Sequence, residues 1–108
     1  MDRDWTPREV AELLEREDIQ LVDVREPAEW EAGRIAGAVH IPLGELGQRA
    51  RALDPARPIV FYCRSGGRSA MATEAFASAG YDARNMSGGM VQWHASGLPI
   101  EPDGGYVA

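Results

Sequence analysis

Two short runs of apolar residues, neither with a polar face, most strongly constrain how this chain can fold. Ile59–Tyr62 is apolar throughout, and Ile19–Val24 is interrupted only by Gln20 and the late Asp23. A strand that is apolar on both sides must be covered on both sides, as strands in a parallel sheet are. The two runs therefore predict an α/β fold with a mainly parallel sheet and helices on both faces.

Helix signals separate the predicted strands. Thr6 fits an N-cap, Pro7 fits the first helical turn and Glu9 completes a capping box, so a helix is expected to begin here. Gly33 and Gly80 are placed to end helices. Further helices are expected from Pro27 and at 46–53, 69–79 and 90–95, and shorter strands at 38–39 and 83–86.

Charge and residue usage exclude several classes of function. The 108 residues carry 11 basic and 17 acidic side chains, a formal net charge of −6. Binders of nucleic acid or of anionic membranes need a basic surface, so neither partner is expected. All the basic residues are arginine, which excludes Schiff-base chemistry and lysine-based phosphate loops. One cysteine and two histidines cannot build a multi-thiolate zinc site or a disulfide framework, so no metal is expected.

The length favours one domain over residues 1–108, with an irregular tail at about 99–108. No apolar run approaches the roughly 20 residues of a membrane span. The first residues lack the basic and apolar regions of a signal peptide. A reducing cytoplasm is therefore the expected location.

Reactive chemistry is expected where the strongest strand ends. Cys63 leaves the carboxyl end of that strand, and the next helix is expected to begin five or six residues later. Ligands of open α/β sheets collect at such ends. Gly66 and Gly67 let the backbone curl with its N–H groups inward, and the helix N-terminus and Arg68 add positive potential. Thiols at comparable sites have pKa values of roughly 3.5–7.5. The loop therefore predicts a reactive thiolate beneath an oxyanion cradle.

Four segments, in this order along the chain, resemble the signatures of the rhodanese family of sulfurtransferases. They are Leu21–Pro27 with Glu29-Trp30, then Gly33–Pro42, then Cys63–Ser69, and last Gly88-Gly89-Met90 with Trp93 and Gly97–Pro99. The resemblance implies a rhodanese-like three-layer sandwich with a five-stranded sheet. It also implies that Cys63 is the catalytic nucleophile and carries a persulfide between two half-reactions. Arg34 and Ala36 depart from the second signature, which affects the expected shape of that loop more than the sulfur chemistry.

The resemblance further implies a reaction and a set of binding residues. The expected enzyme is a thiosulfate sulfurtransferase whose loop binds thiosulfate or another small anionic sulfur donor. The persulfide sulfur would pass to a thiophilic acceptor, which is cyanide in an assay and a thiol or a protein in the cell. No cofactor is required. The substrate-binding residues would be Arg64, Ser65, Gly66, Gly67, Arg68 and Ser69.

Two other functions stay open at this stage. The domain could be a persulfide carrier or interaction module for a protein partner, with thiosulfate turnover incidental. A cysteine-based phosphatase or arsenate reductase is less favoured, because such enzymes place five residues between nucleophile and arginine. Only four residues separate Cys63 from Arg68, and a smaller ring of donors suits one sulfur atom better than a tetrahedral phosphoryl group.

Residues outside the loop are expected to support it or to pack. Asp23 and Arg25 lie at the active-site end of a strand, where a buried ion pair is favoured over substrate contact. Glu29 could pair with an arginine. Trp93 and Met90 are expected in the core, Tyr62 in packing, and Arg34 in solvent. His40 and His94 are not expected to act as bases, because a thiolate already ionised by its loop needs none.

Overall fold

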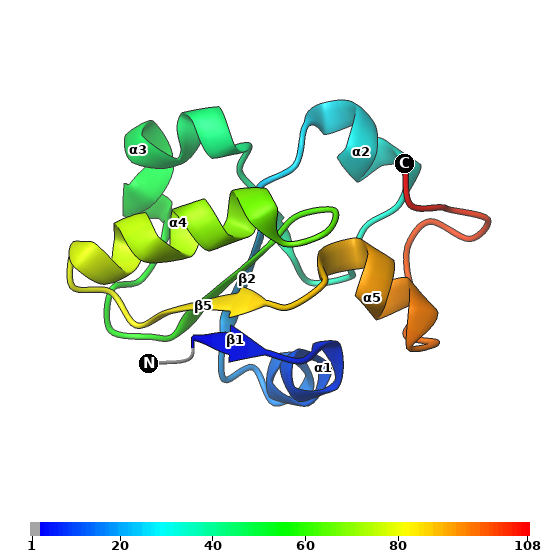
Figure 1. The fold of residues 1–108 in the computed structure, drawn as a ribbon, viewed down its shortest axis with the longest axis horizontal. Coiled ribbons are helices and arrows are strands. Elements are labelled where there is room, and N and C mark those ends of the chain that lie inside the picture. Colours follow the sequence, from blue (N-terminus) through cyan, green and yellow to red (C-terminus); the bar gives the residue numbers. More distant parts are fainter. Residues whose placement is uncertain (1–2) are drawn as a thin grey trace.

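The computed structural model describes residues 3–108, which form a five-stranded parallel sheet between two layers of helices (Figure 1). The strand order is β1-β5-β4-β2-β3, and every neighbouring pair is parallel. The strands are β1 (Asp4–Trp5), β2 (Gln20–Asp23), β3 (Val39–His40), β4 (Ile59–Tyr62) and β5 (Ala83–Met86). The helices are α1 (Pro7–Glu15), α2 (Pro27–Ala32), α3 (Leu46–Arg49), α4 (Gly67–Ser78) and α5 (Gly89–Ala95).

The central strand β4 is buried over its whole length, and its side chains alternate between two apolar cores. Ile59 and Phe61 pack into the core that α3 and α4 cover. Val60 and Tyr62 pack into the core that α1 and α5 cover on the opposite face. Figure 1 shows these helix pairs on opposite sides of the sheet. The apolar strand β4 is therefore covered by helices on both faces of the sheet, and the predicted α/β fold is confirmed.

The expected capping box at the start of α1 is present. The Thr6 hydroxyl accepts a hydrogen bond from the Glu9 N–H (3.2 Å), and the Glu9 carboxylate accepts one from the Thr6 N–H (2.9 Å). These bonds satisfy two of the helix N–H groups that have no partner inside the helix. Val10, one residue further on, is then fully buried against the sheet.

Several elements differ from the sequence-based prediction, and the strand expected at 38–39 is shifted by one residue, to Val39–His40 (β3). The expected helix at 46–53 is wrong in extent, since α3 has four residues between two short 3₁₀ helices, Leu43–Glu45 and Ala50–Ala52. The apolar residues Leu43, Leu46, Ala50 and Leu53 pack on one core, and their three- and four-residue spacing suits the tighter 3₁₀ turns at both ends. Strand β1 was not predicted, because two residues show no periodicity.

Helix α4 begins at Gly67, two residues before its expected start at Ser69. Gly66 lies in the left-handed region (φ +115°) and turns the chain directly from the loop into the helix. Arg68 and Ser69 therefore belong to the first helical turn, where backbone N–H groups have no partner within the helix, and the Ser69 N–H faces Cys63.

The C-terminal residues are irregular, but they pack back onto the segment around the end of α2. Glu101 forms an isolated antiparallel bridge with Arg34, through two hydrogen bonds of 2.8 Å between their backbones. The Tyr106 N–H donates to the Ala32 carbonyl at the end of α2 (2.9 Å). Within residues 3–108, no helix has both the length and the apolar character needed to cross a membrane.

Candidate active site

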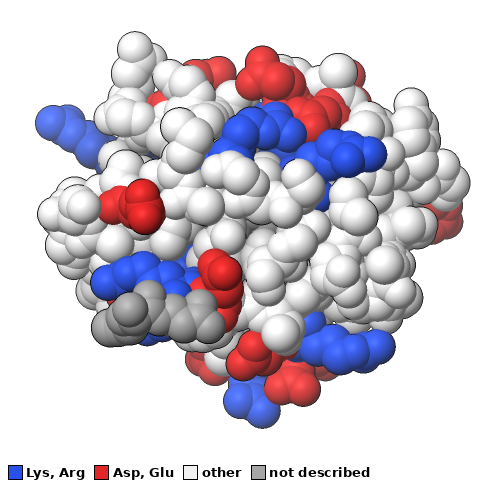
Figure 2. Space-filling model, viewed as in Figure 1, with Lys and Arg blue, Asp and Glu red and all other residues white. Residues whose placement is uncertain are grey.

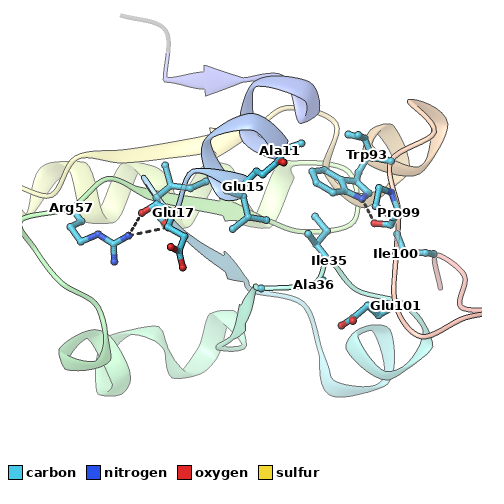
Figure 3. Close-up of a pocket in the computed structure, with 14 residues that line it drawn as sticks. Ala11, Glu15, Glu17, Ile35, Ala36, Arg57, Trp93, Pro99, Ile100 and Glu101 are labelled. Carbon is cyan, nitrogen blue, oxygen red and sulfur yellow. Dashed lines mark hydrogen bonds between the residues drawn. The ribbon is translucent and has the colours of Figure 1, made fainter.

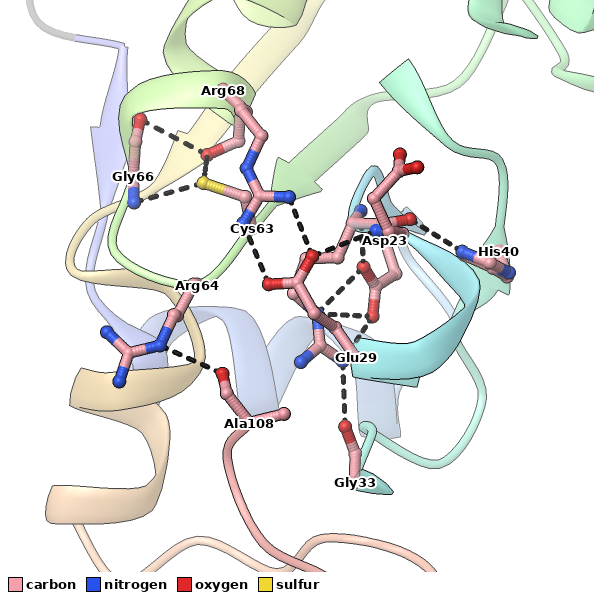
Figure 4. Close-up of polar contacts among 12 residues, drawn as sticks. Asp23, Glu29, Gly33, His40, Cys63, Arg64, Gly66, Arg68 and Ala108 are labelled. Carbon is pink, nitrogen blue, oxygen red and sulfur yellow. Dashed lines mark hydrogen bonds and ion pairs between the residues drawn. The ribbon is translucent and has the colours of Figure 1, made fainter. Parts of the chain in front are cut away.

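The Cys63 thiol lies at the carboxyl end of β4, at the centre of the sheet, and is 2% exposed. Its sulfur accepts hydrogen bonds from the Gly66 N–H (3.1 Å) and from the Ser69 hydroxyl (3.4 Å) (Figure 4). Both donors come from the loop and the first turn of α4. The thiol is thus surrounded by hydrogen-bond donors at a helix N-terminus, where negative charge is favoured.

These contacts decide the ionisation of the thiol. Burial raises the pKa of Cys63. The Ser69 hydroxyl and the backbone N–H groups of Ser69, Gly66 and Ser65 together outweigh burial and lower that pKa below its usual value. Hydrogen bonds to the charged form favour it, so the thiolate is stabilised in the folded protein.

The two loop glycines have different roles. Gly66 adopts a positive φ, which only glycine adopts without strain. Gly67 has helical backbone and open space around the position of a Cβ, so the backbone there does not require glycine. Of the two glycines, only Gly66 is required for the curved backbone of the loop. Ser65 is exposed, and its backbone rather than its side chain faces the thiol.

Helix α5 holds the loop from the other side, which the sequence reasoning did not identify. The N–H groups of Met90 and Val91 donate to the carbonyl oxygens of Cys63 (2.9 Å) and Arg64 (3.0 Å). A Cβ on Gly89 would overlap both of these carbonyls. The Gly88-Gly89 pair is the sequence signal that marks this close approach. Because N–H groups of α5 bind the carbonyl oxygens of Cys63 and Arg64, the N–H groups of the loop face the sulfur.

Arg68 does not project freely into the site but is paired with Glu29 of α2. Both terminal nitrogens of Arg68 donate to the Glu29 carboxylate, at 2.7 and 2.9 Å (Figure 4). Glu29 also accepts a hydrogen bond from the Glu26 N–H (3.0 Å) and so completes the capping box of α2. The Arg68 hydrogen bonds lower the pKa of Glu29 to about 2, and the carboxylate raises the pKa of Arg68.

Arg64 lies at the surface of the loop, and its Nε donates to the carbonyl oxygen of Ala108 (2.9 Å). The contact joins the active-site loop to the C-terminal segment, as Figure 4 shows. Among residues 3–108, the contact that orients the Arg64 side chain is therefore the one to the Ala108 main-chain oxygen, and no Asp or Glu side chain pairs with it.

Asp23 and Arg25 form a fully buried ion pair at the carboxyl end of β2, next to the end of β4. The Arg25 guanidinium donates to both Asp23 oxygens (2.7–3.1 Å) and to the Gly33 carbonyl (2.7 Å). It also lies over the Tyr62 ring, 5.7 Å from the centroid. This pair ties β2 to the segment after α2. The favoured interpretation, a bracing ion pair, agrees with this geometry.

Trp30, Arg34 and His40 pack together at α2, whereas Trp93 and Met90 belong to the core. The Trp30 ring stacks on His40 (4.8 Å between centroids), and His40 Nε2 donates to the Arg25 carbonyl (2.7 Å). Arg34 is not simply solvated as expected, because it lies over the Trp30 ring and donates to the Trp30 carbonyl. Trp93 and Met90 are buried in the core, as predicted.

A hollow with a volume of about 820 Å³ lies on the face of the sheet that α1 and α5 cover, away from Cys63 (Figure 3). It is mainly apolar, with Ile35 and Trp93 in its wall and Glu15, Glu17 and Glu101 among its lining residues. Arg57 donates to the Glu17 and Ile19 carbonyls at one end of it. No residue of the Cys63 loop lines this hollow, so it belongs to a different part of the surface.

The surface charge on one face and the grouping of metal-binding side chains can both be described. On the face shown in Figure 2, basic and acidic side chains are interspersed rather than segregated. Among residues 3–108, no three His, Cys, Asp or Glu side chains come together as metal ligands would.

Comparisons with known proteins agree on one family. A family model described as a rhodanese-like domain matches residues 6–96. The chain is 39% identical over 94 residues to a sulfurtransferase of Allochromatium vinosum, covering 85% of this chain and 88% of that protein. It is 41% identical over 97 residues to the HTH-type transcriptional regulator Rv0324 of Mycobacterium tuberculosis, covering 84% of this chain but 42% of that protein. A solved rhodanese-related protein from Thermoplasma volcanium superimposes with a TM-score of 0.85 at 29% identity, over 92% of this chain and 97% of that one.

Proposed function

The chain belongs to the rhodanese-like domain family, and on that premise we propose that it transfers sulfane sulfur through a persulfide on Cys63. The observation that carries the proposal is the pair of hydrogen bonds from the Gly66 N–H and the Ser69 hydroxyl to the Cys63 sulfur. A thiolate held by such donors is a ready nucleophile, and the same donors can hold the terminal sulfur of a persulfide.

The first half-reaction loads the cysteine. With thiosulfate, the Cys63 thiolate attacks the outer sulfur, the S–S bond of the donor breaks, and sulfite leaves with the bonding electron pair. With a thiol persulfide, the same attack releases the thiolate of the donor. In both cases Cys63 keeps one sulfane sulfur, and no electron acceptor or cofactor is consumed.

The second half-reaction returns the free thiolate. A thiophilic acceptor attacks the outer sulfur of the Cys63 persulfide, the S–S bond breaks, and the electron pair returns to Cys63. Cyanide would yield thiocyanate in an assay, and a thiol or protein thiol would yield a new persulfide. The loop N–H groups stabilise the anionic sulfur at each stage, because they are fixed in place by α4 and α5 before the reaction begins.

Phosphoryl or arsenate chemistry is less well supported. An arginine clamps a tetrahedral oxyanion through two parallel N–H hydrogen bonds, for which its two terminal nitrogens are well placed. In this protein those nitrogens of Arg68 donate to Glu29. The short loop, with four residues between Cys63 and Arg68, further favours a single sulfur atom over a phosphoryl group.

We also propose the extent of the domain and its location in the cell. We treat residues 1–108 as one catalytic domain. Its location is proposed to be the cytoplasm, because a thiolate nucleophile needs a compartment that keeps it reduced. A role as a persulfide carrier for a protein partner stays open, since the chain also matches part of a longer regulator.

Mass spectrometry of the intact protein tests the assignment. Incubation with thiosulfate or with a small-molecule thiol persulfide should add the mass of one sulfur atom, which a reducing thiol then removes. Cys63→Ser should add none with either donor, because its hydroxyl stays protonated in a site that stabilises only a thiolate. Absence of added sulfur on the native protein with both donors would overturn the proposed function. Transfer that is slow to cyanide but fast to a protein thiol would identify the carrier role.

A further inference from the structure

Four charged side chains beside the thiol form two ion pairs whose formal charges cancel. Asp23 pairs with Arg25, and Glu29 pairs with Arg68. The Arg68 charge is close enough to Cys63 for the thiolate to help raise the pKa of Arg68, after the larger effect of Glu29. The loop arginine that could attract an anionic donor is thus offset by a carboxylate that reaches it from α2.

We propose that Glu29 determines donor specificity by withdrawing the Arg68 charge from dianionic donors such as thiosulfate, so that the site favours persulfides of thiols. This inference rests on the proposed function, because it concerns the donor of the same sulfur-transfer reaction. It assigns to Glu29 a role beyond its place in the cap of α2.

The geometry of the Glu29–Arg68 pair supports this role. Its bidentate form, with distances of 2.7 and 2.9 Å, uses the two N–H groups that would otherwise bind two oxygens of a sulfonate group. The Glu29 side chain is 18% exposed and that of Arg68 36%, so the pair sits at the boundary between loop and solvent. A donor entering the site meets a closed ion pair instead of a free guanidinium.

The charge of the donor then decides how well it binds. Thiosulfate carries two negative charges toward a thiolate that carries a third. Arg64, the other arginine of the loop, pairs with no Asp or Glu side chain of residues 3–108, but it is exposed, screened by solvent and held by the Ala108 main-chain oxygen. A thiol persulfide brings at most one negative charge on its sulfur atoms, so it meets less repulsion from Cys63 and depends less on a free cation.

Glu29→Gln isolates the charge of Glu29 from its structural role. Glutamine also serves at the third position of a capping box, so α2 keeps its N-terminal hydrogen bonds. The substitution leaves the Arg68 charge unbalanced. Glu31→Gln is the matched control, because Glu31 is on the same helix, loses the same charge and is exposed.

The rate of Cys63 alkylation measures the electrostatic potential near the sulfur and does not depend on sulfur transfer. Iodoacetate and iodoacetamide have similar size and differ by one negative charge. The ratio of their rates is independent of the fraction of thiolate, since both reagents need the thiolate. We expect Glu29→Gln to raise the ratio of iodoacetate to iodoacetamide rate about threefold to tenfold at low ionic strength, with less effect at high salt. Glu31→Gln should change the ratio less than about twofold.

Steady-state kinetics with thiosulfate and with a thiol persulfide measures the specificity for the sulfur donor. In Glu29→Gln the KM for thiosulfate should fall several-fold with kcat little changed, and the KM for a thiol persulfide should stay near that of the native protein. An unchanged alkylation ratio, or equal effects of Glu29→Gln and Glu31→Gln, would overturn the role of Glu29. A changed ratio in a protein that accepts sulfur from neither donor would overturn the proposed function while leaving the charge effect of Glu29 established. A Cys63 that neither reagent alkylates would remove the reactive thiolate on which both proposals stand.

Discussion

Gly89, at the start of α5, packs directly against the carbonyl oxygen of Cys63, leaving no room for a side chain. The Met90 N–H donates to the same oxygen at 2.9 Å. Through this contact the first turn of α5 fixes the peptide that follows Cys63. The position that orients the loop is therefore 26 residues further along the chain, where the sequence offers only a pair of glycines.

Gly89→Ala should displace the loop and destabilise the fold. The added Cβ would overlap the Cys63 and Arg64 carbonyls, and alanine disfavours the positive φ of this residue (+55°). Overpacking and backbone strain together are expected to cost about 2–4 kcal/mol, with at least a tenfold loss of sulfur transfer. Urea denaturation and the intact-mass assay measure the two effects. Gly47→Ala is the control, because a Cβ there meets no atom and the residue lies in helix α3; a similar loss in both variants would contradict the packing argument.

Ser69→Ala should raise the pKa of the Cys63 thiol. The lost hydroxyl is a hydrogen-bond donor to the sulfur, and hydrogen bonds from Ser69 oppose the effect of burial on this thiol. The pH midpoint of Cys63 alkylation by iodoacetamide should lie below the usual ~8.5 in the native protein and should shift upward in the variant. Because folding lowers this pKa, the stability that the thiolate contributes is complete above the usual thiol pKa. It is lost as the pH falls through the folded value. Ser78→Ala, at the exposed far end of α4, should leave the midpoint unchanged; equal midpoints in the Ser69 variant and the native protein would contradict the role of the hydroxyl.

Asp23→Asn should destabilise the protein strongly, because it leaves the charge of Arg25 buried without its partner. Both side chains are completely buried, and Asp23 accepts three hydrogen bonds from the Arg25 guanidinium. Breaking such a pair costs about 3–5 kcal/mol. Asp82→Asn breaks the exposed pair with Arg84 and should cost less than about 1 kcal/mol. Chemical denaturation compares the two, and a loss below that of Asp82→Asn would show that the buried pair is dispensable.

A glycine inserted after Gly66 should reduce sulfur transfer and increase affinity for phosphate. Five residues would then separate Cys63 from the arginine, and the loop donors could spread around a tetrahedral group instead of a single sulfur. Phosphate affinity of the insertion variant and of the native protein, measured at matched thermal stability, tests the geometry. A glycine inserted after Gly80, in the exposed turn beyond α4, controls for the insertion itself. Phosphate binding by the native chain as tight as by the loop variant would show that loop length does not select the substrate.

Features held by neighbours in the sequence were predictable from the sequence alone. The capping box of Thr6 and Glu9 spans three residues, and β4 needs four apolar residues in a row. Cys63 follows β4 directly, so its place at the carboxyl end of the sheet follows from the strand itself. Local hydrogen bonding and side-chain periodicity extend over a few residues, so both can be recognised in the amino-acid sequence.

The tertiary structure alone decided which side chains meet across the site. Glu29 and Arg68 are 39 residues apart, and nothing near either residue shows that α2 brings a carboxylate to the loop. The contact arises because β2 and β4 are neighbours in the sheet, which places the segments after both strands at the same edge. The sequence therefore determined the place of Cys63 and of the loop that donates to its sulfur. The packing of α2 and α5 against that loop determined the charge it presents and the direction of its N–H groups, because both depend on contacts between residues distant in the chain.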